Sequence, residues 1–150
     1  MLDRRHVVGE LLKNRGDAAV VTGLGSPTYD VAAVSPGERN YYLWGAMGGA
    51  VMTGLGLALA QPGLRVIVIT GDGEALMGMG SLATVGTINP PNLSIVVLDN
   101  EHYGETGMQQ SHLGMGVDLC AVAAACGLAQ ARRVNAAPMA RGRASPAVAG

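Results

Sequence analysis

An acidic residue between two glycines follows a strongly apolar stretch in the middle of the chain. The stretch is VIVIT (66–70), and Gly71, Asp72 and Gly73 come directly after it. Glycines let a backbone approach a bulky anion, and a helix that begins there offers free N–H groups to a phosphate. The Asp72 carboxylate would repel that phosphate unless a cation lay between them, and Mg²⁺ commonly bridges the two. The motif therefore favours Mg²⁺ plus a diphosphate, although an ordinary turn closed by an Asx hydrogen bond has the same sequence.

A second polar side chain stands at the end of the next apolar stretch. Asn100 follows LSIVVLD (93–99) and lies 28 positions after Asp72. If both stretches are neighbouring parallel strands, one helical crossover brings their carboxyl ends side by side. A carboxylate, a carboxamide and a main-chain carbonyl then form the hard oxygen set that suits Mg²⁺ or Ca²⁺. The pair predicts a cation site more strongly than the glycine-flanked acid does alone.

The elements that would position these residues alternate between helices and strands. Apolar periodicity predicts helices over 3–15, 45–60 and 75–86, with one more after Asp118, and strands near 18–22, 65–70 and 93–100. This alternation is typical of an α/β fold, a parallel sheet flanked by helices, in which ligands bind at the carboxyl ends of the strands.

The two motifs in this order resemble the signature of the thiamine diphosphate-dependent enzymes. LWGAMGGAVMTGLGLALA (43–60) is similar to the family segment before the GDG strand, and LDNEHYG (98–104) resembles the LNNxxYG motif. The resemblance covers about residues 18–130. Within the family, the chain looks closest to the sulfopyruvate and phosphonopyruvate decarboxylase group. The implied architecture is the thiamine diphosphate-binding fold, represented by its diphosphate-binding domain.

The resemblance implies a Mg²⁺ site and a diphosphate site at the two strand ends. Asp72 and the Asn100 side chain would bind the metal, and the main-chain carbonyl of His102 would be the third protein ligand. Backbone N–H groups of Gly73 and Glu74 would bind the diphosphate. Glu74 stands where the family often has a small or hydroxyl residue, so its charge must point away from the diphosphate.

The same resemblance implies contacts to the rest of the cofactor. Gly71 would open the diphosphate turn, and the loop that contains Gly25 and Ser26 would line the cofactor edge. The carbonyl of Gly45 would accept a hydrogen bond from the aminopyrimidine, while Met47 would hold thiamine in its bent conformation.

Three residues after the metal loop are candidate catalytic residues. Glu105 and Thr106 occupy positions where the family often places residues that face the substrate, and His112 is a further candidate contact. The alternative for each is an ordinary loop position. Asp99 also departs from the family pattern, which has Asn there, and we expect it to hydrogen-bond the loop rather than the metal.

The resemblance accounts for only one of the two domains that such an enzyme needs. Residues 1–134 correspond to the diphosphate-binding domain, whereas the pyrimidine-binding domain, with its activating Glu, would come from a separate chain in a hetero-oligomer. Residues 135–150 are rich in Ala, Pro, Gly and Arg without periodicity, so we expect a disordered tail, with the C-terminal part of the fold truncated or altered.

The function implied is that of a thiamine diphosphate- and Mg²⁺-dependent decarboxylase subunit, inactive without its partner, that acts on a small 2-oxo acid. Two alternatives stay open: an acetolactate synthase-like carboligase subunit, and a truncated inactive paralogue that serves only as a binding partner.

Composition argues against other classes of protein. Charged residues make up only 14% of the chain, which fits a large buried subunit interface. The uncharged stretch 40–64 is interrupted by glycines and Pro62, so no membrane span is expected. The arginines of the tail lack interleaved aromatic residues, so we expect no nucleic-acid partner. Two cysteines and no signal peptide predict a cytoplasmic protein.

Overall fold

A parallel β-sheet forms the centre of the chain, as the sequence predicts. The computed structural model describes residues 2–135 and 147–149. Within them the strands lie in the order β2-β1-β3-β4-β8-β7, and every pairing in this sheet is parallel. The strands are β1 (Ala19–Thr22), β2 (Asn40–Tyr42), β3 (Val66–Gly71), β4 (Leu93–Leu98), β7 (Arg133–Val134) and β8 (Ala147–Ala149). A separate hairpin joins β5 (His102–Tyr103) to β6 (Gln109–Gln110).

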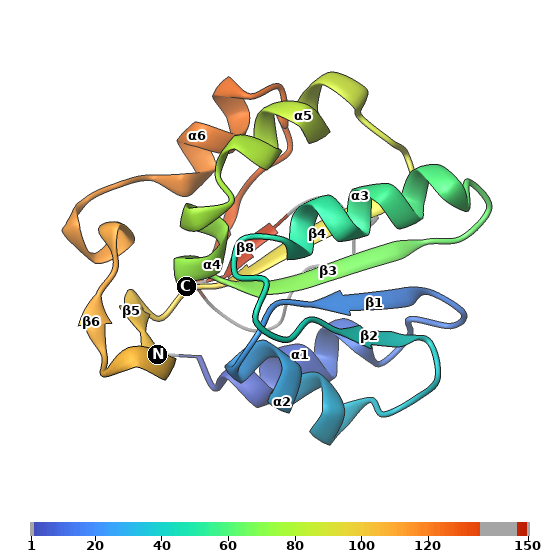
Figure 1. Ribbon diagram of the computed structural model, residues 1–150, viewed down its shortest axis with the longest axis horizontal. Helices are drawn as coiled ribbons and strands as arrows, with labels where there is room; N and C mark the ends of the chain where they lie inside the picture. Colours follow the sequence, from blue (N-terminus) through green and yellow to red (C-terminus); the bar gives the residue numbers. More distant parts are fainter. Residues whose placement is uncertain (1, 136–146, 150) are drawn as a thin grey trace.

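Helices cover both faces of this sheet (Figure 1). One face carries α1 (Arg4–Leu12) and α2 (Ser26–Val34), while the other carries α3 (Ala50–Ala60), α5 (Gly80–Ile88) and α6 (Leu119–Ala125). The short helix α4 (Asp72–Met77) follows β3, and two 3₁₀ turns, Gly104–Thr106 and His112–Met115, lie near the hairpin. This confirms the predicted fold class, a parallel sheet flanked by helices.

Alternate residues of the central strands build two separate cores. Val66 and Val68 of β3 pack with the helices of the α3 face, whereas Ile69 packs with α1 and α2. Strand β4 is buried along its whole length and divides its side chains in the same way. A strand that is apolar on both faces is typical of the centre of a parallel sheet.

The register of β3 and β4 places the two polar motifs side by side. Gly71 pairs with Leu98 at the carboxyl ends of the strands. Asp72 directly follows Gly71, and Asp99 and Asn100 directly follow Leu98. The sheet thus brings together two segments that are far apart in the sequence.

Glycines change two of the predicted helix boundaries. The helix expected from residue 45 begins only at Ala50, because Gly45 and Gly48 have φ values of 79° and 92°, which lie outside the helical region. The helix expected over 75–86 is instead divided into α4 and α5. Near this break a Cβ on Gly78 would lie 2.2 Å from the carbonyl oxygen of Gly48, so the two backbones are in direct contact.

Side-chain caps fix the start of two helices. Asp3 precedes α1 and accepts a hydrogen bond from the backbone N–H of His6 at 2.7 Å. The predicted cap at Asp118 is confirmed, since its carboxylate accepts from the N–H of Ala121 at 3.1 Å at the start of α6.

The predicted tail falls largely outside the part of the chain that the structure describes. This holds for residues 136–146 and 150, so disorder of these residues stays a prediction. Residues Ala147–Ala149 of the expected tail instead form β8, which lies between β4 and β7. Among the described residues no helix is long and apolar enough to cross a membrane.

Candidate functional site

A pocket of about 990 Å³ opens at the carboxyl ends of β1, β3 and β4. Its lining includes ten of the residues that the sequence singled out: Ser26, Met47, Gly71, Asp72, Gly73, Glu74, Asn100, His102, Glu105 and Thr106. Ligands of open α/β sheets bind at this edge. The structure therefore gathers most of the candidate site in one cavity.

Asp72 is the most strongly positioned of these residues. It is the first residue of α4, and only 2% of it is exposed. Its Oδ2 accepts a hydrogen bond from the hydroxyl of Ser111 at 2.5 Å, and Ser111 itself is fully buried. Within the described chain neither Lys nor Arg forms an ion pair with Asp72. A buried carboxylate held by one donor and facing a cavity is suited to binding a cation.

The pocket carries an excess of negative charge. Six acidic residues and two arginines line it: Asp3, Asp30, Asp72, Glu74, Asp99 and Glu105 against Arg4 and Arg5. An anionic ligand would be repelled here unless a cation accompanied it. The oxygen donors fit Mg²⁺, but no cluster of three His, Cys, Asp or Glu side chains among the described residues holds a metal unaided. Ligand or water oxygens would have to complete the coordination.

Two hydrogen-bonded turns shape the loop that follows β4. Asp99 Oδ1 accepts from the N–H of Glu101, and Asn100 Oδ1 accepts from the N–H of His102, both at 3.0 Å. The His102 ring Nδ1 lies 2.8 Å from the Asn100 carbonyl oxygen. Glu101 has a φ of 61°, in the left-handed region. The contact of Asp99 agrees with the expected loop-bonding role, and metal binding by Asn100 and His102 stays a prediction.

Burial raises the pKa of Asp99, and the neighbouring carboxylate of Asp72 raises it further. The hydrogen bond from Glu101 and the charge of Arg133 act in the opposite direction. An acid whose pKa is higher in the folded chain binds more protons there than in the unfolded chain. Its ionisation therefore lowers the free energy of unfolding as the pH rises from 3.8, its ordinary pKa, to the raised pKa of the folded chain.

We expect Asp99→Asn to remove this pH-dependent cost. The carboxamide keeps the acceptor for Glu101 but cannot ionise. Urea denaturation between pH 4 and pH 7 should show the variant gaining stability relative to the wild type as the pH rises. Asp17→Asn, at an exposed turn, is the control and should not produce this trend. A stability difference that is constant over the pH range would contradict the assignment.

The ring of Tyr103 occupies the space that a side chain would need at Gly73, the second glycine of the GDG motif. A Cβ on Gly73 would lie 2.5 Å from Cδ1 of Tyr103, so the ring packs directly on the start of α4. Gly71 has open space around it instead. The diphosphate turn and the loop after β4 are therefore in contact through Tyr103.

Glu105 similarly covers the glycine loop after β1. Gly25 precedes α2 with a φ of 76°, and a Cβ on it would lie 2.6 Å from Oε1 of Glu105. Thr106 donates a hydrogen bond to the side chain of Gln109 at 2.8 Å, within the β5–β6 turn. Both residues line the pocket, and their catalytic roles stay predictions.

Three candidate residues do not line this pocket. Gly25 is buried beneath Glu105, while Gly45 and His112 are exposed. Contacts of these three residues with cofactor or substrate stay predictions.

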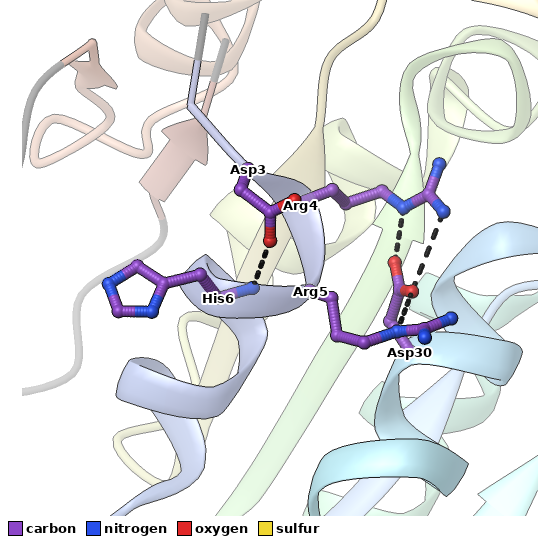
Figure 2. A network of polar contacts seen from close by, with 5 residues as sticks. All are labelled: Asp3, Arg4, Arg5, His6 and Asp30. Carbon is purple, nitrogen blue, oxygen red and sulfur yellow. Dashed lines mark hydrogen bonds and ion pairs between the residues drawn. The ribbon is translucent and has the colours of Figure 1, made fainter.

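An ion-pair network between α1 and α2, which the sequence did not reveal, is formed by residues that also line the pocket. Figure 2 shows the network. Asp30 is fully buried, and its carboxylate binds both Arg4 and Arg5 from the first turn of α1. The Arg5 Nε lies 3.2 Å from Asp30 Oδ1. The partners are 25 and 26 residues apart, so no local pattern marks them.

Comparison with known proteins gives one family consistently. Residues 23–145 match the family of the thiamine pyrophosphate enzyme C-terminal TPP binding domain. The chain is 42% identical over 126 residues to sulfopyruvate decarboxylase subunit beta of Methanocaldococcus jannaschii, covering 83% of this chain and 66% of the relative. It is 48% identical over 111 residues to phosphonopyruvate decarboxylase of Streptomyces viridochromogenes, covering 74% of this chain and 28% of that enzyme.

A solved structure shares the fold. A Mycobacterium smegmatis protein, provisionally described as a thiamin diphosphate-dependent enzyme, superposes with a TM-score of 0.75 at 22% identity. The superposition covers 99% of this chain and 31% of that protein. The chain thus spans about a third of this neighbour and no more than about two thirds of the two relatives.

Proposed function

Because this chain belongs to the thiamine pyrophosphate enzymes, through their C-terminal TPP-binding domain, we propose that it is a subunit of a Mg²⁺-dependent 2-oxo acid decarboxylase. The observation that carries the proposal is the buried Asp72 carboxylate, which faces an acidic pocket at the start of a helix. The names of the sulfopyruvate and phosphonopyruvate decarboxylases support the choice of reaction.

In this proposal the ends of β3 and β4 hold the metal and the diphosphate. Asp72, the side chain of Asn100 and the carbonyl of His102 bind Mg²⁺, whose charge offsets the acidic pocket. Backbone N–H groups of Gly73 and Glu74 bind the diphosphate, where the helix N-terminus favours negative charge. The hydrogen bond from Ser111 keeps the Asp72 carboxylate oriented towards the metal.

The remaining candidate residues orient the reacting groups. Ser26 and Met47, which line the pocket, contact the organic part of the cofactor, while Glu105 and Thr106 face the 2-oxo acid. When bound, thiamine diphosphate supplies the carbon nucleophile and accepts the electrons left when CO₂ departs. The chain's own contribution is therefore to bind and orient the cofactor and to exclude water from its surroundings.

We further propose that a pyrimidine-binding subunit, on a separate chain, covers the pocket. Large apolar side chains near its mouth support this: Met77 is 62% exposed and Met108 is 57% exposed, and both line the pocket. Trp44 is 68% exposed and stacks edge-on against Tyr29, with ring centroids 6.3 Å apart. Exposed apolar and aromatic side chains of this kind are typical of protein interfaces.

We also propose a cytoplasmic location for the chain. Cys120 and Cys126 are both free thiols. Burial raises the pKa of the Cys120 thiol, and the charge of Asp118 acts in the same direction. Unpaired thiols are typical of a reducing compartment.

Reconstitution tests the proposed function. The chain is assayed with thiamine diphosphate, Mg²⁺ and sulfopyruvate, phosphonopyruvate or pyruvate, first alone and then with a chain that carries a pyrimidine-binding domain. We expect CO₂ release only from the pair, because in this proposal the Glu that activates the cofactor lies on the pyrimidine-binding chain. Rapid CO₂ release by the isolated chain would refute the split enzyme. An acetolactate-type product from the pair would favour the carboligase instead, and an inert pair would favour the inactive paralogue.

A further inference from the structure

Glu74 carries a buried carboxylate that the proposed chemistry does not use. The residue is only 5% exposed, although it follows directly after the GDG motif. Its Oε2 accepts a hydrogen bond from the hydroxyl of Thr70 at 2.9 Å, and its Oε1 accepts from the backbone N–H of Ala50 at 3.4 Å. Among the described residues no Lys or Arg forms an ion pair with it. A buried carboxylate in this position needs compensation from neighbouring dipoles.

The compensating dipole belongs to α3. Ala50 is the first residue of this eleven-residue helix, and the preceding Gly49 has no side chain with which to cap it. The first N–H groups of a helix lack intrahelical partners and carry a positive partial charge. Glu74 therefore takes the place of the missing N-cap side chain, although it belongs to a different helix.

Gly23 provides the space that the carboxylate fills. A Cβ on Gly23 would lie 1.6 Å from Oε2 of Glu74 and 2.7 Å from the hydroxyl oxygen of Thr70. The carboxylate thus lies where three segments meet: the loop after β1, the end of β3 with the start of α4, and the start of α3. The loop 45–49, which contains Met47, leads directly into that last segment.

We propose that Glu74 is a positioning residue that caps α3 from α4 and so fixes the loop 45–49 against the diphosphate turn. The consequence for the cofactor rests on the proposed function, because it assumes that Met47 and Gly73 contact thiamine diphosphate. The capping contact itself does not depend on that function. It also explains how a Glu is accommodated beside a diphosphate site, since the carboxylate points into the protein rather than towards the ligand.

Hydrogen exchange of the ligand-free chain tests the capping contact without any cofactor. In Glu74→Ala the amide of Ala50 should exchange about tenfold faster than in the wild type, because its acceptor is gone. Glu74→Gln keeps an acceptor oxygen at Oε1, so it should retain most of the protection. Unchanged exchange at Ala50 in the Ala variant would overturn the proposal. So would a Gln variant that exchanges as fast as the Ala variant.

Calorimetry with Mg²⁺ and thiamine diphosphate then tests the consequence for the site. Glu74→Ala should weaken binding about tenfold, as removing a supporting contact of a ligand-binding group commonly does, and Glu74→Gln should largely restore it. Asp118→Ala is the matched control, because it removes the cap of α6 away from the pocket. It should lower the melting temperature by a similar amount and leave the affinity unchanged. An equal loss of affinity in both alanine variants would show a general effect of stability and overturn the positioning role.

A double-mutant comparison tests whether Gly23 and Glu74 protect Ala50 through the same contact. Gly23→Ala should displace the Glu74 carboxylate and reproduce the faster exchange of Ala50. Adding it to Glu74→Ala should then produce little further change at Ala50, whereas additive increases would contradict the shared mechanism. If the wild type bound no thiamine diphosphate, the proposed function would fail, but the exchange data would still decide the cap.

Discussion

Asp72→Ala should weaken Mg²⁺-dependent binding of thiamine diphosphate by at least about a hundredfold. Asp72 is a buried acid at the start of α4 that lines the pocket, and the variant loses the charge that would bridge to the diphosphate through the metal. The Ser111 hydroxyl would also lose its acceptor in a buried position, which adds to the disruption. Calorimetry with Mg²⁺ and the cofactor, in the presence of the partner chain, measures the effect.

Two further variants show whether the metal is the reason. Asp72→Asn keeps the shape and an acceptor for Ser111 but loses the charge, so it should bind nearly as weakly as the Ala variant. Ser111→Ala keeps the charge of Asp72 but removes the hydrogen bond that orients its carboxylate. We therefore expect a roughly tenfold loss of affinity. Wild-type affinity in Asp72→Asn would contradict the assignment of Asp72 as a metal ligand.

Gly86→Ala should cause the largest loss of stability among simple glycine substitutions in the helices. Gly86 lies in α5, and a Cβ there would be 1.7 Å from the carbonyl oxygen of Cys126, at the end of α6. The backbone carbonyl of Cys126 cannot move aside as the end of a flexible side chain can, so α5 and α6 must separate. Overpacking of this kind costs about 1–3 kcal/mol or more. We expect a loss of roughly 2 kcal/mol in urea denaturation of the isolated chain, after the gain from alanine's helix propensity.

Gly56→Ala is the matched control within another helix. Gly56 lies in α3, is exposed, and has no atom within 4 Å of the added methyl group. Alanine should therefore stabilise the chain by about 0.5–1 kcal/mol through helix propensity alone. If both substitutions changed stability in the same direction, close packing of α5 against α6 would not explain the first result.

The sequence predicted the central sheet because its strands are apolar on both faces and end at polar motifs. A single crossover was expected to bring the ends of these two strands side by side, and the observed register of β3 and β4 places Asp72 and Asn100 at one edge. Helix boundaries were less accurate where glycines adopt left-handed φ values. Gly45 and Gly48 read as part of an apolar helix, yet they form the loop that precedes α3.

The contacts that hold the candidate site join residues that are far apart in the sequence, so a local sequence pattern does not reveal them. Ser111 lies 39 residues from Asp72, and Asp30 lies 26 residues from Arg4. The buried environment of Ser111 depends on the folded arrangement of the 3₁₀ turns. The resemblance to the thiamine diphosphate enzymes supplied the cofactor-binding candidates, and the family match confirms that resemblance.

The backbone contact between Gly48 and Gly78 also restricts how this protein can evolve. A side chain at Gly78 would enter the carbonyl of Gly48, and one at Gly48 would require a left-handed φ of 92° and approach Gly78 N at 3.0 Å. Neither position can therefore accept a larger residue by a single mutation while the loop keeps its place. The two glycines should be inherited together, and a lineage that lost one would first have to rebuild the loop that contains Met47.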